Sequence, residues 1–62
     1  MNSNYYIITF TNKLTVFASA FNESEAIILA QATMIKNGNT YDVDNVRETR
    51  HIEDAKLTNF CV

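Results

Sequence analysis

The sequence predicts a small α+β domain, in which a three-stranded sheet carries one helix on one face in the order strand, strand, helix, strand. Two neighbouring segments rich in β-branched and aromatic residues, 5–11 and 14–21, predict the first two strands. An apolar run bounded by helix-capping residues follows, and a third strand-like segment occupies residues 41–48. The 62 residues are expected to form a single domain, 1–62, with an ordered core of about 4–52.

The first two strands are expected to form a hairpin. Thr11-Asn12-Lys13 provides a three-residue turn in which Asn12 or Lys13 adopts a positive φ. This turn gives one face of the hairpin only apolar residues, through the pairs Phe10 with Leu14, Ile8 with Val16 and Tyr6 with Ala18. We expect this register because a shift by one residue would mix the two faces.

The helix has a start signal and a stop signal. Asn22 precedes Glu25 by three residues, which predicts a capping box, and Gly38 predicts a left-handed cap at the other end. At 100° per residue, one continuous arc is suited to pack on the sheet. Its members are Ala26, Ile27, Leu29, Ala30, Thr33 and Met34.

The third strand is expected to contain an irregularity. Its apolar residues change step between Val43 and Val46, which predicts a β-bulge near Asp44 and Asn45.

The end of the chain is predicted less specifically. Residues 49–52 could continue the third strand, residues 53–57 could form one helical turn, and residues 58–62 are expected to be flexible.

More apolar residues occur than one helix packed on one face of a sheet requires. Ile28, Ala32 and Ile35 lie opposite the core arc of the helix, and Ile7 and Phe17 are expected on the open face of the sheet. Contiguous exposed apolar surface on a small protein usually marks an interface. Two alternatives remain open: the register differs, or the C-terminal segment folds back over one of these patches.

Charge and motifs argue against several classes of function. Five basic and seven acidic residues give a net charge of −2 without a basic stripe, so nucleic-acid binding is not expected to be strong. A single glycine excludes a glycine-rich phosphate loop, and one histidine, His51, with one cysteine, Cys61, is too few for a structural zinc site. We therefore expect no enzyme activity, no cofactor and no metal.

The cellular setting is inferred from the same composition. A lone cysteine cannot form an internal disulfide, and no apolar stretch reaches the ~20 residues of a membrane span. The sequence therefore predicts a cytoplasmic protein without a membrane partner, located in the host cytoplasm if it is encoded by a phage.

A family resemblance extends from the second strand to the third, about two-thirds of the chain. The helix start Glu25-Ala26-Ile27-Ile28-Leu29-Ala30 and the strand Tyr41-Asp42-Val43-Asp44-Asn45-Val46-Arg47 carry it. The chain resembles the small early protein with which T-odd podophages shut off bacterial RNA polymerase. The resemblance implies a compact domain that occupies the DNA channel of the polymerase through arginines of its third strand. Arg47 matches one arginine position, Asn45 occupies the other, and Arg50 could substitute for it.

These observations lead to one expected function and two alternatives. The first is a non-catalytic module that binds a host protein, such as RNA polymerase, as an inhibitor or regulator. The alternatives are a homodimeric accessory or structural protein, and a nucleic-acid-binding domain that would use Lys13 and the two arginines. The candidate partner-binding residues are Ile7, Phe17, Ile28, Ala32, Ile35, Arg47 and Arg50.

Overall fold

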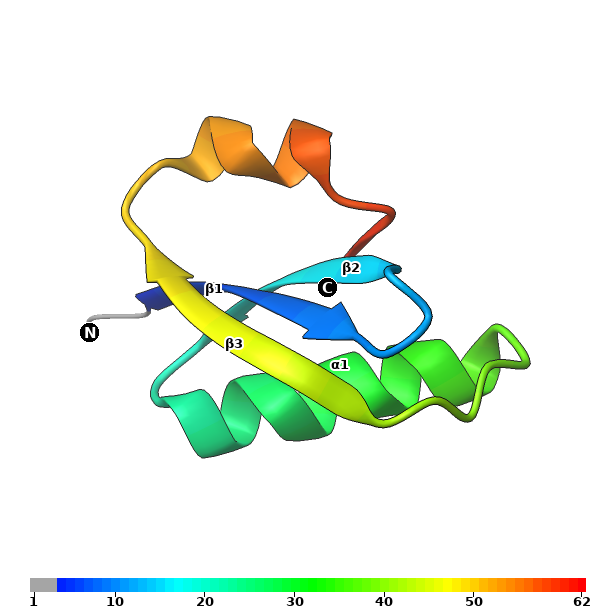
Figure 1. The fold of residues 1–62 in the computed structure, drawn as a ribbon. Helices are drawn as coiled ribbons and strands as arrows, with labels where there is room; N and C mark the ends of the chain where they lie inside the picture. The colour runs from blue at the N-terminus through cyan, green and yellow to red at the C-terminus, as the bar shows by residue number, and fades with distance from the viewer. Residues whose placement is uncertain (1–3) are drawn as a thin grey trace.

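The computed structural model describes residues 4–62, with helices on both sides of one sheet (Figure 1). The elements in chain order are β1 (Asn4–Phe10), β2 (Thr15–Ala20), α1 (Glu23–Lys36), β3 (Val43–Thr49), the 3₁₀ helix η1 (Ile52–Leu57) and β4 (Phe60–Cys61).

The sheet has four strands in the order β3-β1-β2-β4, rather than the expected three. β1 pairs antiparallel with both β2 and β3, and the short β4 pairs parallel with β2 at the opposite edge. In Figure 1, α1 lies across one face of the sheet and η1, coloured orange, lies on the other side. The predicted α+β class is confirmed, but both faces of the sheet are covered.

The predicted hairpin register is confirmed. Ile8 pairs with Val16 and Tyr6 with Ala18. Phe10 N donates to Leu14 O at 2.9 Å across the turn, and Lys13 has the expected positive φ, 75°. The turn residues therefore determine which side chains of the hairpin face α1.

The main core lies between the hairpin and α1. Ala26, Ala30 and Met34 are the buried residues of α1, as the helical periodicity predicted. Two small alanines in the contact allow the helix to lie close to the sheet. The complete set of buried residues in this cluster is Tyr6, Ile8, Phe10, Val16, Ala18, Ala20, Ala26, Ala30 and Met34.

Replacing Ala30 by Leu is expected to destabilise the protein by ~1–3 kcal/mol, because a fully buried alanine leaves no space for three further carbons. Ala32→Leu is the matched control, since it makes the same change two residues away on the exposed face of α1. Urea denaturation of both variants measures the difference, and equal stability of the two would contradict this orientation of the helix.

The helix begins and ends where the sequence predicted. Asn22 Oδ1 accepts a hydrogen bond from Glu25 N at 2.8 Å, and Gly38 has φ +81°. The reciprocal bond differs from a capping box, because the Glu25 carboxylate accepts from Phe21 N, at 3.1 Å, instead of from Asn22 N. The carboxylate therefore holds the chain one residue before the cap.

The predicted bulge is present in β3. Thr9 pairs with Asn45, whereas the next residue of β1, Phe10, pairs with Val43, so Asp44 is the additional residue on β3. The bulge keeps Val43 and Val46 on the same side, where both pack against the main core.

The C-terminal segment differs from its prediction. Residues 58–62 were expected to be flexible, but they contain β4 and form backbone bonds to β2. Asn59 N donates to Thr15 O at 3.0 Å, and Val62 N donates to Phe17 O at 2.8 Å. The Asn59 side chain adds a bond from Thr15 N at 2.9 Å. These bonds join the end of the chain to the edge of the sheet.

A side-chain hydrogen bond connects η1 to β3. Thr49, the one buried polar residue in the described chain, donates from its Oγ1 to Asp54 Oδ2 at 2.6 Å. His51 N donates to the same Thr49 hydroxyl at 3.2 Å. The bond fixes the start of η1 relative to β3, so that the segment returns over the sheet.

Candidate functional site

The outer face of α1 carries an exposed apolar stripe, which we define as Ile28, Ala32 and Ile35. Both isoleucine side chains are 65% exposed. They lie on the side of α1 opposite Ala26, Ala30 and Met34 because of the helical repeat. The sequence predicted this exposure, and it leaves two large apolar side chains in water in the isolated chain.

Polar residues border the stripe on both sides. At 100° per residue, Ser24 and Gln31 flank one edge of the stripe, and Glu25 and Lys36 flank the other. One edge is therefore uncharged, and the other carries an anion near the start of α1 and a cation near its end.

A second candidate surface is the open edge formed by β3. This strand pairs with β1 on one side and is the last strand of the sheet on the other. Its exposed residues are Asp44, Asn45, Arg47 and Glu48. Charged side chains and a bulge are common devices against unspecific edge-to-edge pairing, and β3 has both.

Arg47 and Arg50 are both exposed at this edge. Arg47 pairs with Ile7, which places it on the sheet face that η1 covers, away from α1. Within residues 4–62 the one close contact between a basic and an acidic side chain joins His51 Nδ1 to Glu53 Oε1 at 3.6 Å, so neither guanidinium has a carboxylate within ion-pair distance there. The two arginines are available to a partner.

Ile7 and Phe17 are not accessible, which corrects the expectation of an open sheet face. Their exposed fractions are 6% and 5%. They pair with each other across β1 and β2 on the face that η1 covers, and the ring of Phe17 stacks on Tyr5 with centroids 5.4 Å apart. Of the two alternatives that the sequence left open, the second therefore holds for this face: the C-terminal segment folds back over it.

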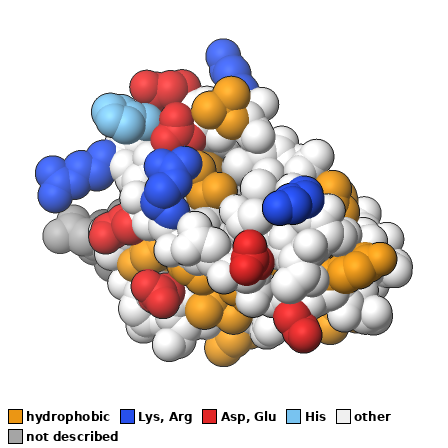
Figure 2. All heavy atoms as spheres, viewed as in Figure 1, with side chains coloured by type: hydrophobic (Ala, Val, Ile, Leu, Met, Phe, Trp, Pro, Cys, Tyr) orange, Lys and Arg blue, Asp and Glu red, His pale blue; other side chains and the backbone are white. Residues whose placement is uncertain are grey.

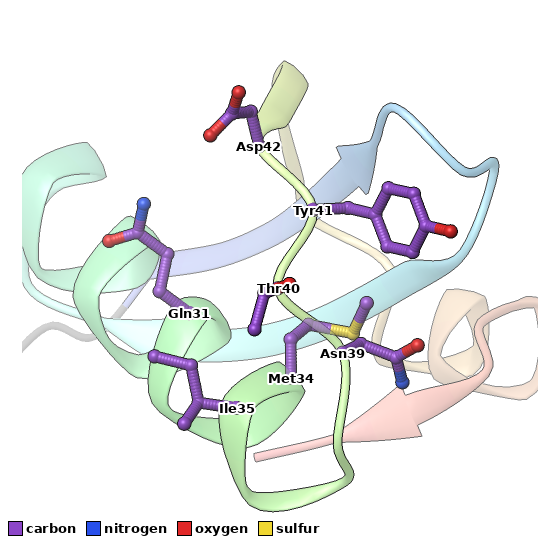
Figure 3. Close-up of a pocket in the computed structure, with 7 residues that line it drawn as sticks. All are labelled: Gln31, Met34, Ile35, Asn39, Thr40, Tyr41 and Asp42. Carbon is purple, nitrogen blue, oxygen red and sulfur yellow. The ribbon is translucent and has the colours of Figure 1, made fainter.

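A shallow pocket of about 270 Å³ lies beside the stripe, between the C-terminal half of α1 and the segment that leads to β3. Figure 3 shows the ring of Tyr41 turned away from Ile35, with Met34 between them. The described residues contain no buried side-chain polar atom without a partner. The pocket therefore extends the surface around Ile35 with a mixed apolar and polar lining, and none of its buried side-chain polar atoms lacks a partner. Its lining residues are Gln31, Met34, Ile35, Asn39, Thr40, Tyr41 and Asp42.

Among residues 4–62, no group of three or more His, Cys, Asp and Glu side chains is placed to hold a metal ion. Cys61 is exposed, and its Sγ lies 3.9 Å from Ala55 O. No helix in the described part of the chain has the length and apolar character needed to cross a membrane.

Charges of both signs are interspersed on the face that Figure 2 shows, without a region of one sign. Comparison of the chain with protein families, curated proteins and solved structures found no match. The candidate functional surfaces of the chain are therefore the stripe of α1 and the arginines at the β3 edge.

Sequence reasoning missed the bond from Thr49 to Asp54, which joins η1 to β3. A threonine at a strand end, followed five residues later by an aspartate, is only a weak signal. The pair becomes informative only when residues 50–53 are known to turn the chain back toward the sheet.

Proposed function

We propose that this chain is a non-catalytic protein-binding module that inhibits or regulates a host macromolecular machine such as bacterial RNA polymerase, and that its β3 edge contacts the target. The observation that carries the proposal is the exposure of Arg47 and Arg50 without a carboxylate partner among the described residues. Arginine is enriched in protein interfaces and among the residues that dominate binding energy.

The position of the arginines supports a protein target. They lie at the open edge of the sheet, next to Asp44 and Glu48, so both signs of charge occur along one strand. Such mixed charge favours a partner with a complementary pattern over a uniform polyanion. The resemblance of the third strand to the polymerase inhibitors of T-odd podophages points in the same direction.

The proposal predicts that the double variant Arg47→Ala with Arg50→Ala loses inhibition in a promoter-dependent transcription assay with purified bacterial RNA polymerase. Truncation of an arginine that dominates an interface costs ~2 kcal/mol or more, so if either arginine has that role the double variant should weaken inhibition by at least tenfold. The fold should persist, because both side chains are exposed.

The matched control is Lys13→Ala with Lys56→Ala, which removes the same charge from the hairpin turn and from η1. Unchanged inhibition by this control would show that position rather than net charge matters. If the parent does not inhibit the polymerase, the proposed target is wrong. If it inhibits but the arginine variant does so equally, the β3 edge is not the contact.

A further inference from the structure

We propose that the stripe of α1 binds the same stripe of a second copy of this chain, with the two helices antiparallel about a two-fold axis. The stripe is an unpartnered apolar surface in the single chain, since Ile28 and Ile35 are each 65% exposed. Three features of the helix favour a second copy as the occupant: the spacing of the isoleucines, the alanine between them and the charges at one edge.

The spacing makes the stripe self-complementary. Ile28 and Ile35 are seven residues apart, which is two turns or about 10 Å along the helix. A two-fold axis midway between them places Ile28 of each copy beside Ile35 of the other, so the contact occurs at two symmetric positions. An isologous interface requires this kind of match between a patch and its own inverted copy.

Ala32 lies next to the position of that axis. Its small side chain is exposed between the two isoleucines, where the helices of a symmetric pair approach each other most closely. Small residues at such a crossing allow the larger neighbours to interdigitate. A bulky residue at this position would separate the two pairs of isoleucines.

The charges select the antiparallel arrangement. Glu25 and Lys36 are eleven residues apart in sequence, so they lie within about 20° of each other around the helix axis, on the same edge of the stripe. A two-fold axis perpendicular to both helices brings this edge against the same edge of the second copy. Glu25 of each copy then lies near Lys36 of the other, whereas a symmetric parallel pair would set this charged edge against the uncharged edge formed by Ser24 and Gln31.

The dimer would leave the β3 edge accessible. Arg47 lies on the sheet face opposite α1, as its pairing with Ile7 requires. The inference is therefore independent of the proposed function. A single helix face provides less than the ~800 Å² per partner of a standard interface, so the dissociation constant is expected in the micromolar range.

Sedimentation equilibrium over a concentration series tests the pairing. The parent should show a monomer–dimer equilibrium. Lys36→Glu brings like charges together at two symmetric positions, so it should raise the dissociation constant about tenfold. Ile28→Lys with Ile35→Lys should remain monomeric with the circular dichroism spectrum of the parent. Arg47→Ala with Arg50→Ala should dimerise as the parent does.

A mixing experiment tests the direction of the helices. Glu25→Lys alone should also dimerise weakly, because two lysines then face two lysines. An equimolar mixture of Glu25→Lys and Lys36→Glu restores attraction at both positions, so it should dimerise more tightly than either variant alone. If the first variant is unfolded because its cap is lost, the Lys36→Glu measurement decides alone.

Two results would overturn the inference. A parent that stays monomeric up to its solubility limit would show that the stripe does not bind a second copy. A dimer that Ile28→Lys with Ile35→Lys leaves intact would place self-association elsewhere on the surface.

Discussion

A chain that ends at Arg50 is expected to be largely unfolded under conditions in which the full chain is folded. The deletion removes η1 and β4, which lie over and beside the sheet face that contains Ile7 and Phe17. These side chains are only 6% and 5% exposed, and uncovering both forfeits ~3–6 kcal/mol of apolar burial. A chain of 62 residues has a free energy of unfolding of roughly 3–9 kcal/mol. The loss on truncation is therefore comparable to the total stability of the protein.

Urea denaturation of the two chains, followed by circular dichroism, measures this loss. The full chain with Leu57→Ala is the control, because that side chain belongs to η1 but is 78% exposed, and its stability should change by less than ~0.5 kcal/mol. A truncated chain as stable as the full one would mean that the C-terminal segment does not cover Ile7 and Phe17.

Phe10→Ala is expected to lower the free energy of unfolding by ~3–5 kcal/mol. The ring is fully buried and is the largest of the fully buried side chains in the main core. Removing it leaves a cavity between the end of the hairpin and its neighbours, which the close-packed surroundings fill only in part. Phe21→Ala is the matched control, because the same atoms are removed from a side chain that is 52% exposed. Thermal unfolding of both variants checks the prediction, and a similar loss in the two would contradict the burial of Phe10.

Local patterns predicted the hairpin, the helix and the bulge because each depends on neighbours in sequence. The turn at residues 11–13 fixed the register of β1 with β2, and the change of step between Val43 and Val46 located the bulge at Asp44. The exposure of Ile28 and Ile35 also followed from local information, since the helical repeat separates the two faces of α1.

The cover over Ile7 and Phe17 could not be derived in the same way. β4 has two residues, too few for an alternating pattern, and its partner strand is far away in sequence. Alternation along β1 and β2 shows that two apolar side chains share a face, but a distant segment determines whether that face is in contact with water. The sequence therefore predicted the second apolar face and left its occupant open.

The distance between β2 and β4 along the chain also has consequences for the order of folding. The bonds from Thr15 to Asn59 join residues 44 apart, whereas the hairpin of β1 and β2 closes a turn of three residues. Closing a long loop costs more chain entropy than closing a short one, and that cost is met before the distant contact contributes. The hairpin should form early and β4 should dock last. Each newly made chain would then pass through a stage in which Ile7 and Phe17 are uncovered, and during that stage the protein would be most vulnerable to aggregation.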